Sequence, residues 1–432
     1  MKANTNRFEN TIFIGMDVHK KSFTLCCYTV ADDKCWGQTK MDADYNLVPQ
    51  YIQKAREYYD LDARVVCGYE AGTLGYSLQR FLAQKGITCI ILAPSTMETS
   101  AKARKLKTDK RDAAIIARCL AMNSYKPVFV PSEKDEEIKR FIRMREDLLK
   151  CAKSIKQQIN AFCLSHGYKY TEGKNHWTQM HMNWLKKLQF SEIDQETLET
   201  YLLSLQQLDE TLKRVTKRIE EFAQEDAYRE NVQKLCCFNG VSTYTALAII
   251  VETGDFARFA AADKYSGFLG LVPGEDSSSE NVNHLGITKA GNVHLRRLLT
   301  ESAQHYQRGK ASQKSAALKK RQAVCSPKDV AYADRCNERL HRKFYKMKNR
   351  NKNSNIAKIA VARELACFIW GMMTGNHDRK PSQPDVLPNA PESPHLRFQG
   401  ETFFFVPKEK GFPRTPFQKE RRGWWQKVTI DD

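Results

Sequence analysis

Two apolar segments that each end in an acidic residue constrain the fold of this chain most. Residues 12–16 are followed by Asp17, and residues 65–69 are followed by Glu70. Short apolar runs of this kind are typical of buried strands. Carboxylates at strand ends can converge on a hard cation such as Mg2+. We therefore expect a sheet in the first part of the chain, with an acidic site at its edge.

A pair of aspartates extends this pattern. Asp109 and Asp112 are three residues apart where a helix is expected to begin, so they share one helix face. A first-strand Asp, a later-strand Glu and such a pair are the residues with which a ribonuclease-H-type fold holds Mg2+. Each carboxylate alone could instead be a helix cap, a turn residue or a surface residue. The combination favours a metal site of several convergent carboxylates.

The charge of the chain indicates a polyanionic partner. The formal net charge is +19, and residues 308–352 contain fifteen Lys and Arg but three acidic residues. Residues 102–111 hold six more, among them Lys105, Lys107, Lys110 and Arg111. Clustered positive charge around an acidic motif suggests phosphodiester chemistry on nucleic acid. The alternative is an ordinary solvated basic surface.

Other features of the sequence indicate a soluble intracellular protein. No apolar run approaches the ~18 residues of a membrane span. The first seven residues lack the apolar core of a signal peptide. The thirteen cysteines are an odd number and include no CxxC motif, which favours buried thiols in a reducing compartment.

The first domain, residues 1–131, is predicted to be α/β. Strands are expected at residues 11–16, 22–29, 64–69, 87–93 and 127–130, with the first two joined as a hairpin. Helices are expected at residues 45–58, 75–85 and 109–122. This order predicts a mixed sheet with helices packed on it.

The rest of the chain is predicted to be mostly helical. Residues 132–230 are interpreted as a helical, coiled-coil region, whose seam pairs either with another helix of the chain or with another subunit. The seam residues are Leu198, Tyr201, Leu205, Leu208, Leu212, Val215, Ile219 and Phe222. Residues 231–375 form a further, mostly helical domain, basic from residue 311 onward. Residues 376–432 hold eight of fourteen prolines and are expected to be extended or disordered.

A run of serines in the third domain supplies a possible nucleophile. Ser277, Ser278 and Ser279 are expected in a loop, because they follow no apolar periodicity. A serine hydroxyl can attack a phosphodiester where cations stabilise the developing charge. Lys289, Arg296 and Arg297 follow closely and could supply those cations. Taken alone, however, a serine-rich loop is usually only a loop.

Several motifs, in order, make the chain resemble a known family. In the first domain these are residues 15–18 (Gly-Met-Asp-Val), 69–72 (Tyr-Glu-Ala-Gly), 75–76 (Gly-Tyr), 93–95 (Ala-Pro-Ser) and 107–113 (Lys-Thr-Asp-Lys-Arg-Asp-Ala). In the third they are residues 240–241 (Gly-Val), 252–255 (Glu-Thr-Gly-Asp), 258–259 (Arg-Phe), 270–273 (Gly-Leu-Val-Pro) and 286–292 (Gly-Ile-Thr-Lys-Ala-Gly-Asn). Together they are similar to the DEDD-type transposases of the "IS one-ten" insertion sequences, relatives of the Piv invertases, also called bridge recombinases.

The resemblance implies a RuvC-like first domain whose tetrad, Asp17, Glu70, Asp109 and Asp112, binds Mg2+. It also implies a transposase domain in residues 231–375 with a catalytic serine at Ser278, although Ser279 stands where the family commonly has glycine and Ser277 is adjacent. The partners implied are donor and target DNA, a noncoding guide RNA and further copies of the chain, from dimer to tetramer, in the bacterial cytoplasm.

Two other functions are compatible with the residues. One is a RuvC-type, metal-dependent junction nuclease that uses water. The other is a nucleic-acid-binding protein without catalysis.

Overall fold

The computed structural model describes residues 10–97, 108–278, 281–309 and 313–377. By its contacts the chain divides into two units. One, made of residues 1–4 and 385–432, lies outside the described residues; the other, residues 5–384, contains every element given below. The prediction for the proline-rich tail therefore falls almost entirely outside the described residues.

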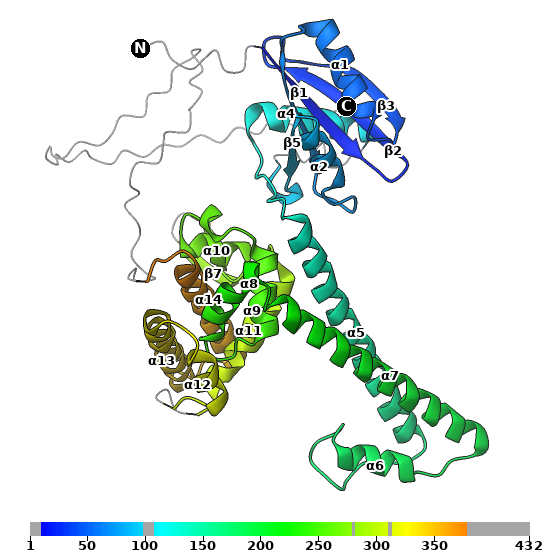
Figure 1. Cartoon of the computed structure of the whole chain (residues 1–432), viewed down its shortest axis with the longest axis vertical. Coiled ribbons are helices and arrows are strands. Elements are labelled where there is room, and N and C mark those ends of the chain that lie inside the picture. Colours follow the sequence, from blue (N-terminus) through cyan, green and yellow to red (C-terminus); the bar gives the residue numbers. More distant parts are fainter. Residues whose placement is uncertain (1–9, 98–107, 279–280, 310–312, 378–432) are drawn as a thin grey trace, which may run out of the picture. The chain divides into compact units, whose positions relative to one another are not determined.

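A five-stranded mixed sheet forms the first part of the fold (Figure 1), as predicted. Its strands are β1 (Thr11–Val18), β2 (Ser22–Thr29), β3 (Lys34–Asp42), β4 (Arg64–Glu70) and β5 (Thr88–Leu92), in the order β3-β2-β1-β4-β5. The pairs β1–β2 and β2–β3 are antiparallel, whereas β1–β4 and β4–β5 are parallel. The strand ends of β1 and β4 therefore meet at one edge.

Helices cover both faces of this sheet. Helices α1 (Leu47–Tyr59) and α2 (Ser77–Gln84) bury apolar residues against one face, together with Ile12, Ile14 and Met16 of β1. Helix α4 (Asp109–Met122) packs on the other face, where Phe13 of β1 joins its core. Because successive side chains of a strand alternate between the faces, β1 contributes to both cores.

The sequence analysis misses one strand of the sheet and wrongly predicts another. Strand β3 was not expected, because it is an exposed edge strand whose polar side chains give no apolar alternation. Conversely, residues 127–130 form no strand; a single bridge pairs Pro127 with Leu92. The hydrogen bonds of this bridge lie on either side of Pro127: the N–H of Ala93 donates to Lys126, and the N–H of Val128 donates to Ile91.

Two long helices follow, α5 (Glu133–Ser165) and α7 (Glu192–Phe222), with the short α6 (Gln179–Lys187) between them. The predicted seam packs within the chain, because Leu198, Leu205 and Leu212 of α7 share a core with Ala152 and Ile159 of α5. The intramolecular alternative for the seam is therefore confirmed. Ser132 caps α5 by accepting a hydrogen bond from the backbone N–H of Asp135.

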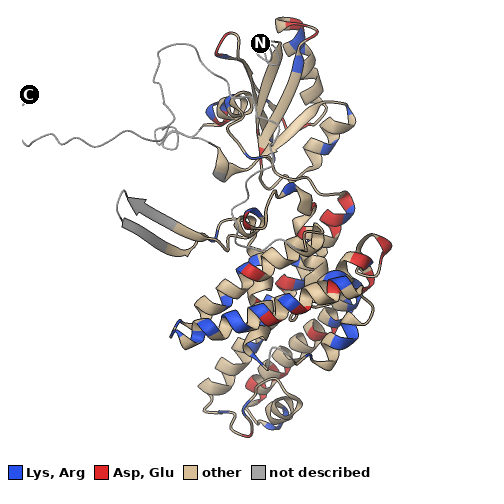
Figure 2. Cartoon of the chain, turned by 90° about the vertical axis from the view of Figure 1, so that its left-hand side faces the viewer, with Lys and Arg blue, Asp and Glu red and all other residues tan. Residues whose placement is uncertain are grey.

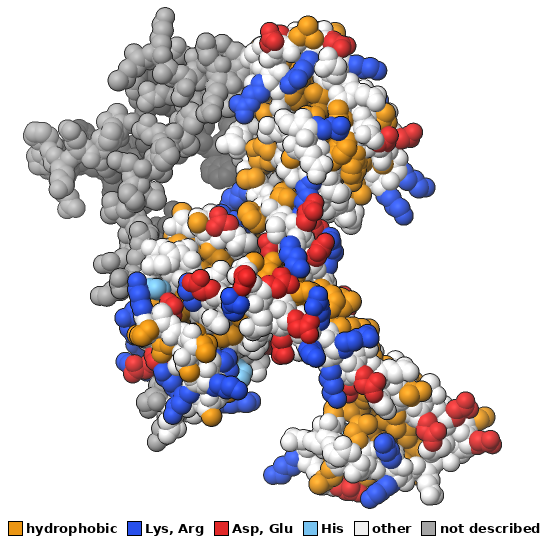
Figure 3. All heavy atoms as spheres, in the orientation of Figure 1, with side chains coloured by type: hydrophobic (Ala, Val, Ile, Leu, Met, Phe, Trp, Pro, Cys, Tyr) orange, Lys and Arg blue, Asp and Glu red, His pale blue; other side chains and the backbone are white. Residues whose placement is uncertain are grey.

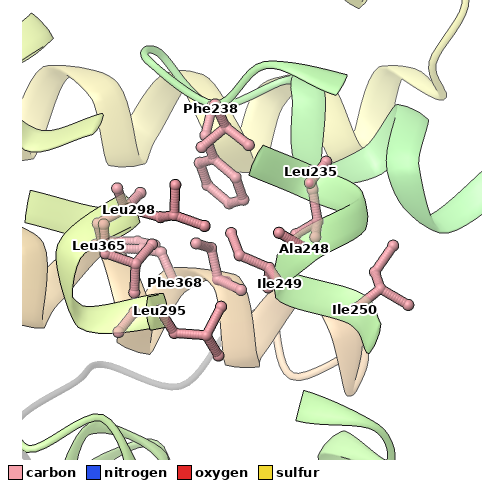
Figure 4. Close-up of a cluster of buried hydrophobic side chains, with 14 of the residues drawn as sticks. Leu235, Phe238, Ala248, Ile249, Ile250, Leu295, Leu298, Leu365 and Phe368 are labelled. Carbon is pink, nitrogen blue, oxygen red and sulfur yellow. The ribbon is translucent and has the colours of Figure 1, made fainter. Parts of the chain in front are cut away.

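The last part of the fold is mostly helical and has one large core. Its elements are α8 (Asp226–Cys236), α9 (Thr243–Thr253), η2 (Phe256–Arg258), α10 (Ala262–Phe268), β6 (Pro273–Ser278), β7 (Asn281–Ile287), α11 (Val293–Ala303), η3 (Gln304–Gln307), α12 (Ala316–Gln322), α13 (Pro327–Asn349) and α14 (Ser354–Met373). Figure 4 shows how Phe238, Ile249, Leu298 and Phe368 converge from four segments of the chain. Helix α14 is buried on most of its surface, which explains its nearly unbroken apolar sequence.

In the described ranges we find no helix that is both long enough and apolar enough to cross a membrane.

Candidate active site

The ends of two neighbouring parallel strands position the first two predicted carboxylates. Met16 of β1 lies beside Tyr69 of β4, and the next residues along the two strands are Asp17 and Glu70. Asp17 is partly buried, with 15% of its side chain exposed, whereas Glu70 is exposed. The two acids therefore lie at the same edge of the sheet, on adjacent strands.

The pleat of the sheet turns both acids toward α4. A β-carbon at Gly15 would meet backbone atoms of Ala113 and Ala117 in α4, and one at Gly68 would meet Leu120. Side chains two residues further on point to the same face. Asp17 follows Gly15 by two residues and Glu70 follows Gly68 by two. Both carboxylates therefore point to the face that α4 covers.

The first turn of α4 brings the other two predicted acids to this face. Asp109 and Asp112 both lie in that turn, after the extended residue Thr108. Negative side chains in a first helical turn interact favourably with the helix dipole. Burial raises the pKa of Asp17, and the negative charges of Asp112 and Asp109 add to this rise.

A histidine joins this cluster. The Nε2 atom of His19 lies 3.1 Å from Oδ2 of Asp17 and 4.0 Å from Oδ1 of Asp109. One potential ligand atom from each of these three residues lies within 4.8 Å of the others. His19 was not among the predicted site residues. The signal was its position two residues after Asp17, in the turn between β1 and β2.

A lysine from the unexpected strand β3 also reaches the cluster. Lys40 Nζ donates a hydrogen bond of 2.9 Å to Oδ2 of Asp109. This bond and the charge of Lys40 lower the pKa of Asp109. The pKa of Asp17 is instead raised, mainly by burial, although His19 opposes the rise. Two carboxylates of one cluster thus differ in their affinity for protons.

The donor set fits a divalent cation. Carboxylate oxygens are the ligands that Mg2+ and Mn2+ prefer, and an imidazole nitrogen also serves Mn2+ and other transition metals. Asp17, Asp109 and His19 provide three such donors close together, and Asp112 adds negative charge. Glu70 is not part of the close group formed by Asp17, His19 and Asp109, and its place at this edge follows from strand register.

Two of the three predicted serines lie in a strand and not in a loop. Ser277 and Ser278 are the last residues of β6, and their backbones pair with Val282 and Asn281 of β7. The expectation of a loop is wrong because a two-stranded hairpin needs no apolar alternation. Of these two serines the structure describes only the backbone, and Ser279 lies outside the described residues.

The base of this hairpin is held tightly against the start of α11. The backbone N–H of Lys289 donates to the carbonyl oxygen of Gly270, and that of Asn292 donates to Phe268. Arg296 Nη1 donates to the carbonyl oxygen of Leu269, at 2.9 Å. The guanidinium of Arg296 is therefore used to fasten the segment from which the hairpin begins.

The neighbouring Arg297 is also engaged within the fold. It pairs with the buried Glu146 of α5 and, at 2.9 Å, with Glu301 of α11. His294 Nδ1 lies 2.6 Å from the same Glu146. A second buried acid, Glu252 of α9, binds Arg143 of α5 and accepts a hydrogen bond from the Asn292 side chain. These ion pairs connect α5, α9 and α11.

The remaining predicted nucleic-acid-binding residues are located as follows. Lys289 is exposed and has a left-handed backbone, with φ of 56°. Lys110 and Arg111 lie exposed in the first turn of α4, beside the acidic cluster. Lys105 and Lys107 lie outside the described residues. Contact of these residues with nucleic acid stays a prediction.

Comparison with known proteins gives consistent matches over most of the chain. Residues 14–166 match a model of DEDD-type IS110 proteins described as "Transposase". Residues 232–318 match one described as "Transposase IS116/IS110/IS902 family". The two matched ranges contain the acidic cluster and the serine hairpin, respectively.

Individual relatives align along nearly their whole length. A putative transposase of Sinorhizobium fredii is 32% identical over 83% of this chain and 88% of its own length. The transposase for the insertion sequence element IS1533 of Leptospira borgpetersenii is 30% identical over 79% of this chain and 98% of its own. A third relative, the IS1111A transposase of Coxiella burnetii, is 24% identical over 84% of this chain.

Proposed function

Because the chain belongs to the IS110 family of insertion-sequence transposases, we propose that it cuts and rejoins DNA strands through a serine nucleophile beside a Mg2+ site. The nucleophile is Ser278, and the metal ligands are Asp17, Glu70, Asp109 and Asp112. The close approach of Asp17 and Asp109 at one sheet edge, with Asp112 in the same helical turn as Asp109, supports this proposal most strongly.

The proposed chemistry is a balanced exchange of phosphodiesters. The Ser278 hydroxyl loses its proton and its oxygen bonds to phosphorus, while the bond from phosphorus to a deoxyribose oxygen breaks. That sugar oxygen takes up a proton. In the second half, the freed hydroxyl of another strand attacks the phosphoserine and releases the serine. One ester bond forms for each that breaks, so no external energy source is needed.

The protein groups have distinct roles in this scheme. A bound Mg2+ would offset charge on the phosphoryl oxygens. Asp17 and Asp109 would hold it from β1 and α4, and Glu70 would approach from β4. Lys289, Lys110 and Arg111, with Lys105 and Lys107, would bind the DNA backbone. Arg296, which holds the base of the hairpin, and Arg297, which pairs with Glu146 and Glu301, would add positive charge.

A covalent-adduct assay tests the role of the serine. The chain is incubated with DNA carrying the element ends, then denatured and resolved by mass. We expect an adduct with the unaltered chain and with Ser277→Ala, but none with Ser278→Ala. If Ser278→Ala still cleaves DNA and no adduct ever forms, water is the nucleophile and the chain is a metal-dependent nuclease. An adduct lost only with Ser277→Ala would move the role to that residue.

A separate measurement tests the metal site. Mn2+ binding, followed by its electron paramagnetic resonance signal, should weaken at least tenfold in Asp17→Asn and in Asp112→Asn. Unchanged binding in both variants would contradict the site. This readout does not depend on DNA, so it separates a failed metal site from a failed serine assignment.

We further propose that a noncoding RNA guides the chain and that several copies act together. The net charge of +19 favours the binding of other polyanions in addition to DNA. RNA that co-purifies with the chain should be one structured species, with segments that pair with donor and target DNA. If only heterogeneous cellular RNA is recovered, the proposal of a guide RNA is wrong. If light scattering of the protein–DNA complex shows a single copy of the chain, the proposal that several copies act together is wrong.

A further inference from the structure

The basic excess of residues 308–352 is concentrated on one side of α13. Lys and Arg occur along most helices of the chain (Figure 2), so net charge alone does not locate a binding surface. Lys328, Arg335, Arg342 and Lys346, however, follow one another at intervals of seven, seven and four residues. At 3.6 residues per turn these intervals place all four on one face of the helix. All four are exposed.

The buried side of α13 fixes the orientation of this basic stripe. Tyr332, Cys336, Leu340 and Phe344 are buried and repeat every four residues. They belong to the large core that α14 also joins. The basic stripe, defined as Lys328, Arg335, Arg342 and Lys346, therefore lies on the side that faces solvent. Lys and Arg side chains gather over α12 and α13 in Figure 3.

Most positive charge of the stripe is not neutralised within the fold. Lys328 and Lys346 form no ion pair with any described residue. Arg335 donates to the carbonyl oxygen of His377, at 3.3 Å, and its guanidinium lies 5.7 Å from the centre of the Tyr332 ring, but neither contact supplies a negative charge. Arg342 pairs with Glu338 one turn earlier, both of them exposed. Exposed pairs of this kind contribute at most about 1 kcal/mol, so a stronger anion can replace the acid.

Two other cations of α13, outside the stripe, have a structural role. Arg339 and Lys343 both bind Glu364 of α14, which is 7% exposed. Burial alone would raise the pKa of Glu364, but its hydrogen bonds and charge contacts with Lys343 and Arg339 lower it. These two residues fasten α13 to α14. Among the described residues no buried acid pairs with the stripe, so its charge needs another explanation.

We propose that the basic stripe of α13 is a docking surface for the phosphate backbone of duplex DNA. From Lys328 to Lys346 the helix rises about 27 Å, at 1.5 Å per residue. That is the length of roughly eight base pairs at 3.4 Å each. The inference rests on the proposed function only for DNA as the partner; it involves neither the carboxylate cluster nor the serine hairpin.

The salt dependence of DNA binding tests the stripe. The full-length chain and the variant Lys328→Gln/Arg335→Gln/Lys346→Gln are titrated with a 30-base-pair duplex at several salt concentrations. Each phosphate contact contributes about 0.9 to the slope of log K against log salt. We expect the slope to fall by about 2 to 3 in this variant. Mg2+ is omitted, so the metal site and the chemistry do not affect the result.

A matched variant controls for net charge. Lys213→Gln/Arg214→Gln/Lys217→Gln also removes two lysines and one arginine, from exposed positions on α7. We expect its slope to change by less than 1. An equal fall in both variants, or an unchanged slope in the α13 variant, would overturn the proposal. A fall seen with duplex RNA but absent with DNA would overturn the choice of DNA.

A crosslinking measurement covers the case in which the triple variant folds poorly. Ala331 is exposed on the face of α13 that carries the stripe. A photoreactive residue at position 331 of the otherwise unaltered chain should crosslink to the duplex, and one at position 213 should not. Absence of a crosslink from position 331, under conditions in which the chain binds the duplex, would contradict the docking surface.

Discussion

A β-carbon added at Gly15 would lie 2.0 Å from the carbonyl oxygen of Ala113. Strand β1 and helix α4 thus touch through their backbones, which only glycine permits at this position. Asp17 is two residues beyond this contact on the strand, and Asp112 is the residue before Ala113 on the helix. The close approach therefore determines the spacing of the acidic cluster.

We expect Gly15→Ala to displace α4 and separate Asp17 from Asp109. The added methyl group meets backbone atoms, which cannot rotate away as a side chain can. The free energy of unfolding should therefore fall by about 1–3 kcal/mol. Mn2+ binding should weaken at least tenfold under conditions in which the variant is still folded, as its urea unfolding curve shows. In Gly72→Ala the new β-carbon would meet only the Glu70 carbonyl oxygen, at 3.8 Å, and both quantities should be unchanged. Unweakened Mn2+ binding in Gly15→Ala would show that the contact does not position the acids.

Lys40→Met should tighten cation binding at pH 7. The Lys40 ammonium repels a cation from Asp109, and its removal should raise the Mn2+ affinity roughly fivefold. Lys40 also lowers the pKa of Asp109, so in the variant this pKa returns toward its ordinary value. Without the cation, Asp109 should therefore take up its proton at a higher pH than in the unaltered chain. Lys54→Met removes an exposed charge from α1 and should change neither quantity. Weaker binding in Lys40→Met would mean that the lysine helps to hold the site together.

Gly270→Ala should disturb the serine hairpin without affecting the acidic cluster. Gly270 has φ of 64°, and its added β-carbon would lie 2.0 Å from the carbonyl oxygen of Ala290. We expect a loss of stability of about 1–3 kcal/mol and at least a tenfold lower yield of the covalent DNA adduct. Mn2+ affinity should be unchanged. At Gly267 a β-carbon meets nothing within 4 Å, so Gly267→Ala is the matched control. A normal adduct yield in Gly270→Ala would contradict the positioning role of this turn.

Glu252→Gln should destabilise the fold by about 3 kcal/mol, because it leaves Arg143 and Lys139 without their buried partner. Burial pushes the pKa of Glu252 upward, but the hydrogen bond from Arg143 and the charge of Lys139 hold it below its ordinary 4.5. A lowered pKa contributes stability that is present above pH 4.5 and is lost as the pH falls through the folded-state value. The free energy of unfolding of the variant should therefore lack this part of its dependence on pH.

Urea unfolding between pH 7 and pH 3 measures both effects of Glu252→Gln. Glu301→Gln provides the comparison, since Glu301 pairs with Arg297 at an exposed position and should contribute less than about 1 kcal/mol. Equal destabilisation by the two variants would refute the special role of the buried acid.

Burial explains which strands could be predicted from the sequence. β1 and β4 are buried on both faces, so their apolar runs reveal them and place Asp17 and Glu70 at their ends. β3 has solvent on one side and no such run. Lys40 was missed for that reason, since the approach of its ammonium to Asp109 depends on a strand that the pattern does not show.

Charge in the sequence identifies residues but not their partners. Arg296 and Arg297 stand out as cations near the serines, yet their contacts with Leu269 and Glu146 come from segments 27 and 151 residues away. The same limit applies to Ser278, whose strand pairing depends on β7 and not on its own neighbours. Only the folded chain shows which cations have an internal partner.

The order of the site residues along the chain has a consequence for synthesis. Helix α4, which completes the acidic cluster against Gly15, ends at Met122, and Ser278 follows 156 residues later. At about 5–20 residues per second, a ribosome needs roughly 8 to 30 s to make that stretch. The carboxylate cluster can therefore fold on the ribosome while the serine has yet to be translated, so a nascent or prematurely ended chain carries the acidic half of the site without its nucleophile.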